Sequence, residues 1–103
     1  MKRLIKVKIF GHTWSVRRIK DEDMKGTVGK TWSFHFAIDL NEELTESELP
    51  LVVKHEVCHA VLDTQGRGFH KKFSNEDLCE FVAWNGDEIT RITNEIMKKL
   101  LED

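Results

Sequence analysis

The sequence predicts an α+β fold in which a three-stranded antiparallel sheet packs on two helices. Apolar and polar residues alternate over residues 4–10, 13–19 and 31–40, which is the period of a half-buried strand. From residue 46 the apolar spacing changes to three and four, the period of an amphipathic helix. A chain of 103 residues, 40% of them hydrophobic, suits one modest core. We therefore expect residues 1–103 to form a single domain.

The three strands are expected to form a hairpin followed by a separate third strand. Gly11-His12 lies between the first two alternating segments and predicts the hairpin turn. Residues 21–30 contain three acids and two glycines without apolar periodicity, so they predict a mobile loop. The third strand, residues 31–40, places four apolar residues on one face, where core packing is expected: Trp32, Phe34, Phe36 and Ile38.

Two helices are expected in the second half of the chain. The first covers about residues 46–64, with Thr45 and Pro50 as start signals, and it ends before the glycines of residues 66–68. Ser74 can cap a second, long helix, for which Gly86 is a possible point of bending. Its apolar stripe is predicted to consist of Leu78, Val82, Ile89, Ile92, Ile96 and Leu100.

Composition and charge exclude several classes of protein. The N-terminus lacks the apolar core of a signal peptide, and no apolar run reaches the roughly 18 residues of a membrane span, so we expect a cytoplasmic protein. Residues 1–30 carry nine Lys/Arg and three Asp/Glu, whereas residues 31–103 carry seven and fifteen. The net charge of −2 and the lack of an arginine-rich run give no strong nucleic-acid signal. Cys58 and Cys79 lack the spacing of a four-thiolate zinc site and predict buried free thiols.

The segment HEVCH at residues 55–59 predicts a zinc site on the first helix. His55 and His59 are four residues apart, so both imidazoles project from one face and can bind one ion. Glu56 leaves the helix at a neighbouring angle, from which its carboxylate can take a proton from a zinc-bound water. The surrounding apolar residues suggest that the histidines lie on or beside a buried stripe. A motif that fixes only three of five residues, such as HExxH, also occurs by chance. A second alternative to zinc ligands is that both histidines are hydrogen-bonded residues of the core.

A third ligand is required, and the second helix offers Glu76 and Glu80 on one face. HExxH followed on a later helix by Asn-Glu, and by another acid four residues on, resembles the glutamate zincins. This resemblance implies that Glu76 is the third ligand and that Glu80 is an acid supporting a ligand histidine. The order of strands and helices is similar to the minimal zincin core of small proteins encoded by phages and mobile elements. The resemblance implies a Zn²⁺-dependent metallopeptidase with Glu56 as general base and a peptide or protein as substrate.

Two features leave alternatives open. Residues 66–73 resemble the glycine-containing loop of SprT-like metalloproteases, and that alignment makes His70 the third ligand. The chain has no tyrosine to act as an oxyanion donor, so His35, His70 or Arg67 would have to substitute. A zinc-stabilised binding or regulatory protein without turnover is therefore an alternative to the peptidase. A nucleic-acid adaptor that uses the basic N-terminal segment is the weakest hypothesis.

For a peptidase, the third strand is expected to supply an edge that pairs with an extended substrate. The sequence does not indicate an oligomeric state.

Overall fold

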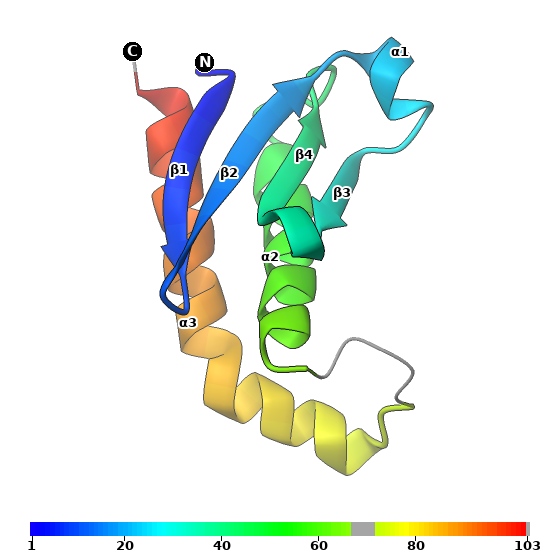
Figure 1. Cartoon of the computed structure of the whole chain (residues 1–103), viewed down its shortest axis with the longest axis vertical. Coiled ribbons are helices and arrows are strands. Elements are labelled where there is room, and N and C mark those ends of the chain that lie inside the picture. The colour runs from blue at the N-terminus through cyan, green and yellow to red at the C-terminus, as the bar shows by residue number, and fades with distance from the viewer. Residues whose placement is uncertain (67–71, 103) are drawn as a thin grey trace.

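The computed structural model describes residues 1–66 and 72–102 of the chain (Figure 1). These residues form an α+β structure with a four-stranded sheet and two long helices. The elements, in chain order, are β1 (Leu4–Ile9), β2 (His12–Ile19), α1 (Asp21–Met24), β3 (Gly29–Trp32), the 3-10 turn η1 (Ser33–His35), β4 (Ala37–Asn41), α2 (Leu49–Thr64) and α3 (Asn75–Leu101).

The sheet is mixed, with strand order β1-β2-β4-β3. β1 pairs antiparallel with β2, β2 pairs parallel with β4, and β3 pairs antiparallel with β4. The α+β class is therefore confirmed, while the prediction of three antiparallel strands is wrong. The parallel pair arises because α1, β3 and η1 all lie in the connection between β2 and β4. That connection leaves β3 at one edge of the sheet.

The predicted N-terminal hairpin is present, with its turn one residue earlier than expected. Ile9 pairs with His12, which leaves Phe10 and Gly11 as the two turn residues. Both have positive φ, at 47° and 83°. A two-residue hairpin turn of this kind matches the right-handed twist of the strands.

Residues 21–41 differ most from the sequence prediction. The expected mobile loop begins with the short helix α1, and residues 31–40 form two strands instead of one. The break follows from Phe36, whose φ of 49° ends the 3-10 turn and reverses the chain into β4. Only Ile38 of the predicted apolar face is buried, and Phe34 is 84% exposed. The prediction of a common core face was wrong because alternation along the sequence does not reveal such a reversal.

The helix α2 begins three residues later than predicted and ends at the predicted residue. The Glu48 carboxylate accepts a hydrogen bond from the Thr45 backbone N–H at 2.9 Å, and Pro50 lies in the first turn. Gly66 follows the helix with a φ of 70°, which confirms the predicted left-handed stop. The buried apolar residues of α2 belong to the core that it shares with the sheet and α3: Leu49, Val53, Val57, Ala60 and Val61.

The helix α3 is one continuous element, as predicted, and it starts with a capping box between Ser74 and Asp77. Figure 1 shows that it bends, so its first turns, drawn in yellow, run away from the sheet while the later turns lie along β1. Leu78 and Val82 are therefore exposed, and their predicted place in the apolar stripe is wrong. Asn85 is buried and exchanges hydrogen bonds with Gln65, which joins α3 to the end of α2.

The core lies between one face of the sheet and the two long helices. Trp14, Val16 and Ile38 of the sheet meet Val57 of α2 and Ile92 of α3, all at most 1% exposed. Because this layer fixes α2 against β3 and β4, the side of α2 next to the sheet edge has a defined orientation.

Both cysteines are free, as predicted, but Cys58 is only partly buried and Cys79 is exposed, so the prediction of buried thiols is wrong for Cys79 and holds only in part for Cys58. Partial burial raises the pKa of Cys58, whereas Cys79 is exposed on the first turns of α3. Among the described residues, none of the helices combines the length and apolar character required to cross a membrane.

Candidate metal-binding and catalytic site

The HEVCH segment lies in the middle of α2, beside the edge strand β3. His55 and His59 project from adjacent turns toward solvent, and the His55 side chain is 67% exposed. The histidines thus lie beside the buried stripe of α2, with their side chains exposed. Val57 and Val61 are buried in the core, whereas Leu51 is exposed. The imidazoles lie at the rim next to β3.

The two imidazoles converge on one point. His55 Nε2 and His59 Nε2 lie 3.2 Å apart, and the rings meet edge to face. Two nitrogens bound to one tetrahedral zinc at about 2.0–2.1 Å are about 3.3 Å from each other. The pair thus already has the spacing of two ligands on a single ion. The same distance also permits one imidazole to donate a hydrogen bond to the other.

Glu56 differs from the histidines in being buried, with 5% of the residue exposed. Its side chain fills the space between α2 and β3, where Thr31 Oγ1 lies 2.8 Å from Oε1 and can donate a hydrogen bond to it. The other oxygen, Oε2, lies 3.9 Å from His55 Nε2. One oxygen of the carboxylate therefore contacts Thr31 of β3, while the other lies near His55.

Gly29 makes this position of Glu56 possible. A Cβ on Gly29 would lie 3.0 Å from Glu56 Cγ, 3.0 Å from Glu56 Oε2 and 3.0 Å from Val52 Cγ1. Such distances are tighter than ordinary Cβ contacts, so a larger residue would require the side chains of Glu56 and Val52 to move by a few tenths of an ångström.

We therefore expect Gly29→Ala to lower the free energy of unfolding by about 1–3 kcal/mol, the usual cost of overpacking. Gly86→Ala is the matched control, because its Cβ would meet only Val82 Cγ1, at an ordinary 3.7 Å, inside a helix where alanine is favoured over glycine. Urea denaturation of both variants measures the difference. A Gly29→Ala protein as stable as the Gly86→Ala protein would contradict this description of the site.

A groove of about 270 Å³ passes over these groups. It is lined by Gly29, Lys30, Thr31, His55, Glu56, His59 and Asp63. At the end nearest the start of α2 it adjoins a larger apolar hollow of about 520 Å³, whose walls include Val28, Leu51 and Val52. The groove thus follows the line of contact between β3 and α2, with the histidine pair along one side.

The structure does not bring the predicted third ligand to this groove. Glu76 and Glu80 are exposed on the first turns of α3, which bend away from the body of the molecule. Among the described residues, no group of three His, Cys, Asp or Glu side chains is arranged to hold a metal ion. The alternative ligand His70 and the possible oxyanion donor Arg67 lie outside the described residues. His35 lines a hollow on the other face of the sheet, near Arg17 and Trp32.

Several groove residues were not predicted from the sequence. Thr31 and Gly29 belong to a strand far from the motif in the chain, and no local pattern connects them to Glu56. Asp63 had a usable signal, because it follows His59 by four residues and therefore shares its side of α2. Lys30 also lines the groove, and its ammonium lies 4.0 Å from the centre of the Trp32 ring.

The fold and the site together define an α+β protein with a converging histidine pair and a buried carboxylate at a sheet edge. Comparisons with protein-family models, curated protein sequences and solved structures gave no match to this chain.

Proposed function

We propose that this chain is a zinc-dependent metallopeptidase of the minimal zincin type. The observation that supports the proposal best is the 3.2 Å separation of His55 Nε2 and His59 Nε2, with a Glu56 oxygen 3.9 Å from the first of these atoms. This separation matches that of two nitrogens on one tetrahedral zinc ion. If HExxH had arisen by chance on a solvated helix, its glutamate would be expected to be exposed, whereas Glu56 is buried beside the histidines.

The donor set fits zinc in part. Two neutral imidazoles are common zinc ligands, and a catalytic site needs a third protein ligand while one position stays open for water. When bound in such a site, zinc lowers the pKa of a water molecule toward about 7 and polarises a peptide carbonyl.

Glu56 is the proposed general base. Its Oε2 lies 3.9 Å from His55 Nε2, so it would be placed to take the proton from the attacking water and then deliver it to the leaving amine nitrogen. Thr31 holds Oε1 through its hydroxyl and leaves Oε2 available for this transfer. Burial between α2 and β3, together with the hydrogen bond from Thr31, restricts the orientation of the carboxylate.

The edge strand β3 is the proposed substrate-binding element. It pairs with β4 on one side only, so its other side can add an extended peptide as a further strand. Because Lys30 and Thr31 line the groove beside His55 and His59, a peptide bound along β3 would pass over the histidine pair. The proposed place of action is the cytoplasm, where free thiols such as Cys58 persist.

Glu76 remains the proposed third ligand, supported by the zincin-like order of HExxH and Glu-x-x-x-Glu, and Glu80 the proposed acid behind a ligand histidine. This arrangement requires the first turns of α3 to swing toward α2.

We expect Glu76→Gln to weaken zinc affinity more than Glu80→Gln or His70→Ala. Losing a direct ligand costs more than the roughly 10- to 100-fold loss of affinity that follows the loss of a supporting group. Competition with a chromogenic chelator gives the three affinities. If His70→Ala has the largest effect, the SprT-like arrangement is favoured.

The experiment that tests the function is turnover. The purified chain, loaded with zinc, is incubated with a mixed peptide library, and new termini are identified by mass spectrometry. We expect cleavage that stops when a chelator removes the metal and returns when zinc is restored. Zinc binding without cleavage would contradict the peptidase.

A second candidate is a zinc-stabilised binding or regulatory protein without turnover. Two observations favour it: the described residues supply only two converging histidines to the site, and the chain has no tyrosine for an oxyanion donor. In that case the groove would bind a peptide and leave it intact. The peptide-library experiment distinguishes this protein from a peptidase, because no new termini would be found.

A further inference from the structure

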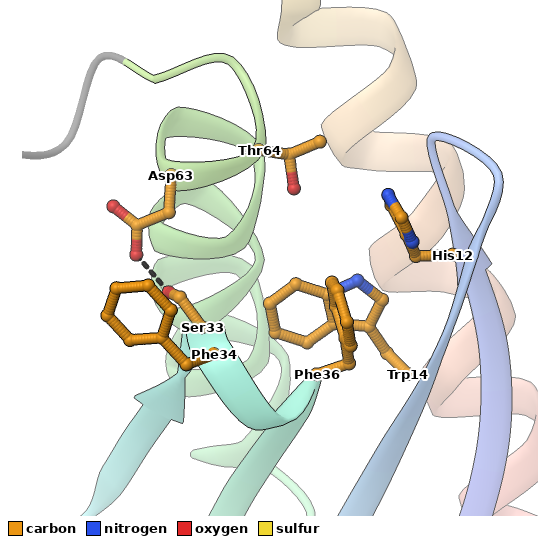
Figure 2. Close-up of a pocket in the computed structure, with 7 residues that line it drawn as sticks. All are labelled: His12, Trp14, Ser33, Phe34, Phe36, Asp63 and Thr64. Carbon is orange, nitrogen blue, oxygen red and sulfur yellow. Dashed lines mark hydrogen bonds between the residues drawn. The ribbon is translucent and has the colours of Figure 1, made fainter.

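A separate pocket lies at the end of α2, directly beyond the groove. It has a volume of about 220 Å³ and is lined by His12, Trp14, Ser33, Phe34, Phe36, Asp63 and Thr64 (Figure 2). Asp63 belongs to both the groove and the pocket. On the other side, β3 ends at Trp32 and the chain continues at once into Ser33 and Phe34. A peptide that extends along β3 past the histidine pair therefore reaches this pocket.

The walls of the pocket are largely aromatic. Trp14 is 1% exposed and meets the edge of Phe36 at a centroid distance of 5.5 Å and an interplanar angle of 80°. Phe36 also stacks on His12 at 4.6 Å. Phe36 has a φ of +49° and ends the 3-10 turn, which places its ring between His12 and Trp14. Phe34 presents an exposed ring beside Asp63.

The polar groups of the pocket are arranged at two ends. At one end the Asp63 carboxylate accepts a hydrogen bond from the Ser33 hydroxyl, which leaves further acceptor capacity. The described residues that line the pocket include no lysine, no arginine and no second carboxylate. At the other end Trp14 Nε1 is buried without an acceptor among the described residues. Figure 2 shows this nitrogen on the side of the indole toward Thr64 and His12.

We propose that this pocket binds a lysine or arginine side chain of the peptide substrate, with Asp63 as its charged partner. This inference rests on the proposed function, since it assigns a substrate class to the same groove. A cationic head group would pair with Asp63 while its apolar stem lies against the ring of Phe34. An acidic side chain would be repelled by the same carboxylate.

The spacing of His59 and Asp63 along α2 limits where on the peptide the basic residue can lie. Asp63 is one helical turn, about 5.4 Å, beyond His59, and an extended chain advances about 3.3 Å per residue. The basic residue is therefore expected within about two positions of the bond that is cleaved.

The test separates binding from turnover by using the full-length Glu56→Gln protein loaded with zinc. Its affinity for capped alanine hexapeptides that contain one arginine, one norleucine or one glutamate is measured by titration calorimetry. Norleucine matches the stem of the basic side chain without its charge. We expect the arginine peptide to bind roughly five- to twentyfold more tightly than the norleucine peptide, the scale of one partly shielded charge contact.

Asp63→Asn, added to Glu56→Gln, should reduce this preference to less than twofold, and Asp63→Lys should favour the glutamate peptide. Asp87→Asn is the matched control, because it removes the same charge from an exposed position on α3 and should leave the preference unchanged. Circular dichroism shows that each variant is folded.

Equal binding of the three peptides, loss of binding by all of them, or an arginine preference that survives Asp63→Asn would each overturn the assignment of this pocket. If the arginine preference depends on Asp63 but the zinc-loaded parent cleaves none of the peptides, the pocket is supported and the peptidase proposal fails.

Discussion

The variants His55→Ala and His59→Ala are expected to lose zinc binding and the thermal stabilisation that zinc gives. The parent protein should bind about one zinc per chain, because the two Nε2 atoms converge on one position. A ligand present at about 100 times its dissociation constant stabilises the folded state by about 2.7 kcal/mol. For a domain of this size we therefore expect excess zinc to raise the Tm of the parent by about 10 °C or more.

Each variant leaves a single imidazole, so its Tm should be the same in zinc and in chelator. His35→Ala is the control, since His35 lies on the other face of the sheet and should not change the response to zinc. Differential scanning calorimetry with and without zinc makes the comparison. If both variants respond to zinc as the parent does, the histidine pair is not the metal site.

Glu56→Gln is expected to abolish most activity while leaving zinc bound. Glutamine has nearly the same volume and can still accept the hydrogen bond from Thr31, but it cannot take a proton from water. Zinc content and Tm should therefore remain close to those of the parent. Any peptidase activity should fall by about 10²- to 10⁴-fold, the usual contribution of a general base.

Equal zinc loading of parent and variant, followed by mass spectrometry of a cleaved peptide library, measures this effect. Glu46→Gln is a useful comparison because it makes the same chemical change at an exposed position before α2, outside the proposed site. Cleavage by Glu56→Gln at the parent rate would show that another group, or a contaminating protease, performs the reaction.

The parts of the fold that follow from local periodicity could be predicted from the sequence. The hairpin, the end of α2 at Gly66 and the cap of α3 at Ser74 each depend on residues adjacent in the chain. The break at Phe36 could not be predicted, because its neighbours alternate like a single strand. Leu78 and Val82 keep the helical period of α3 and yet are exposed, since periodicity does not show where a helix leaves the core.

In the candidate site, too, some features follow from local residue spacing and others depend on the packing of distant segments. The convergence of His55 and His59 follows from a spacing of four on one helix, and the structure places their Nε2 atoms 3.2 Å apart. The hydrogen bond from Thr31 to Glu56 and the close approach of Gly29 depend on the packing of β3 against α2, which no local pattern records. The position of Glu76 depends on the bend in α3, which the sequence pattern does not show. Its role as a zinc ligand remains a prediction.

The most direct test of the proposed site is an anomalous-scattering map recorded at the zinc absorption edge from crystals grown with zinc. We predict one strong peak within about 2.0–2.1 Å of both His55 Nε2 and His59 Nε2, with Glu76 as the third protein ligand. The Glu56 carboxylate should lie near the peak without binding it. A map with no peak at the histidine pair, in protein shown to be saturated with zinc, would contradict the assignment of this site.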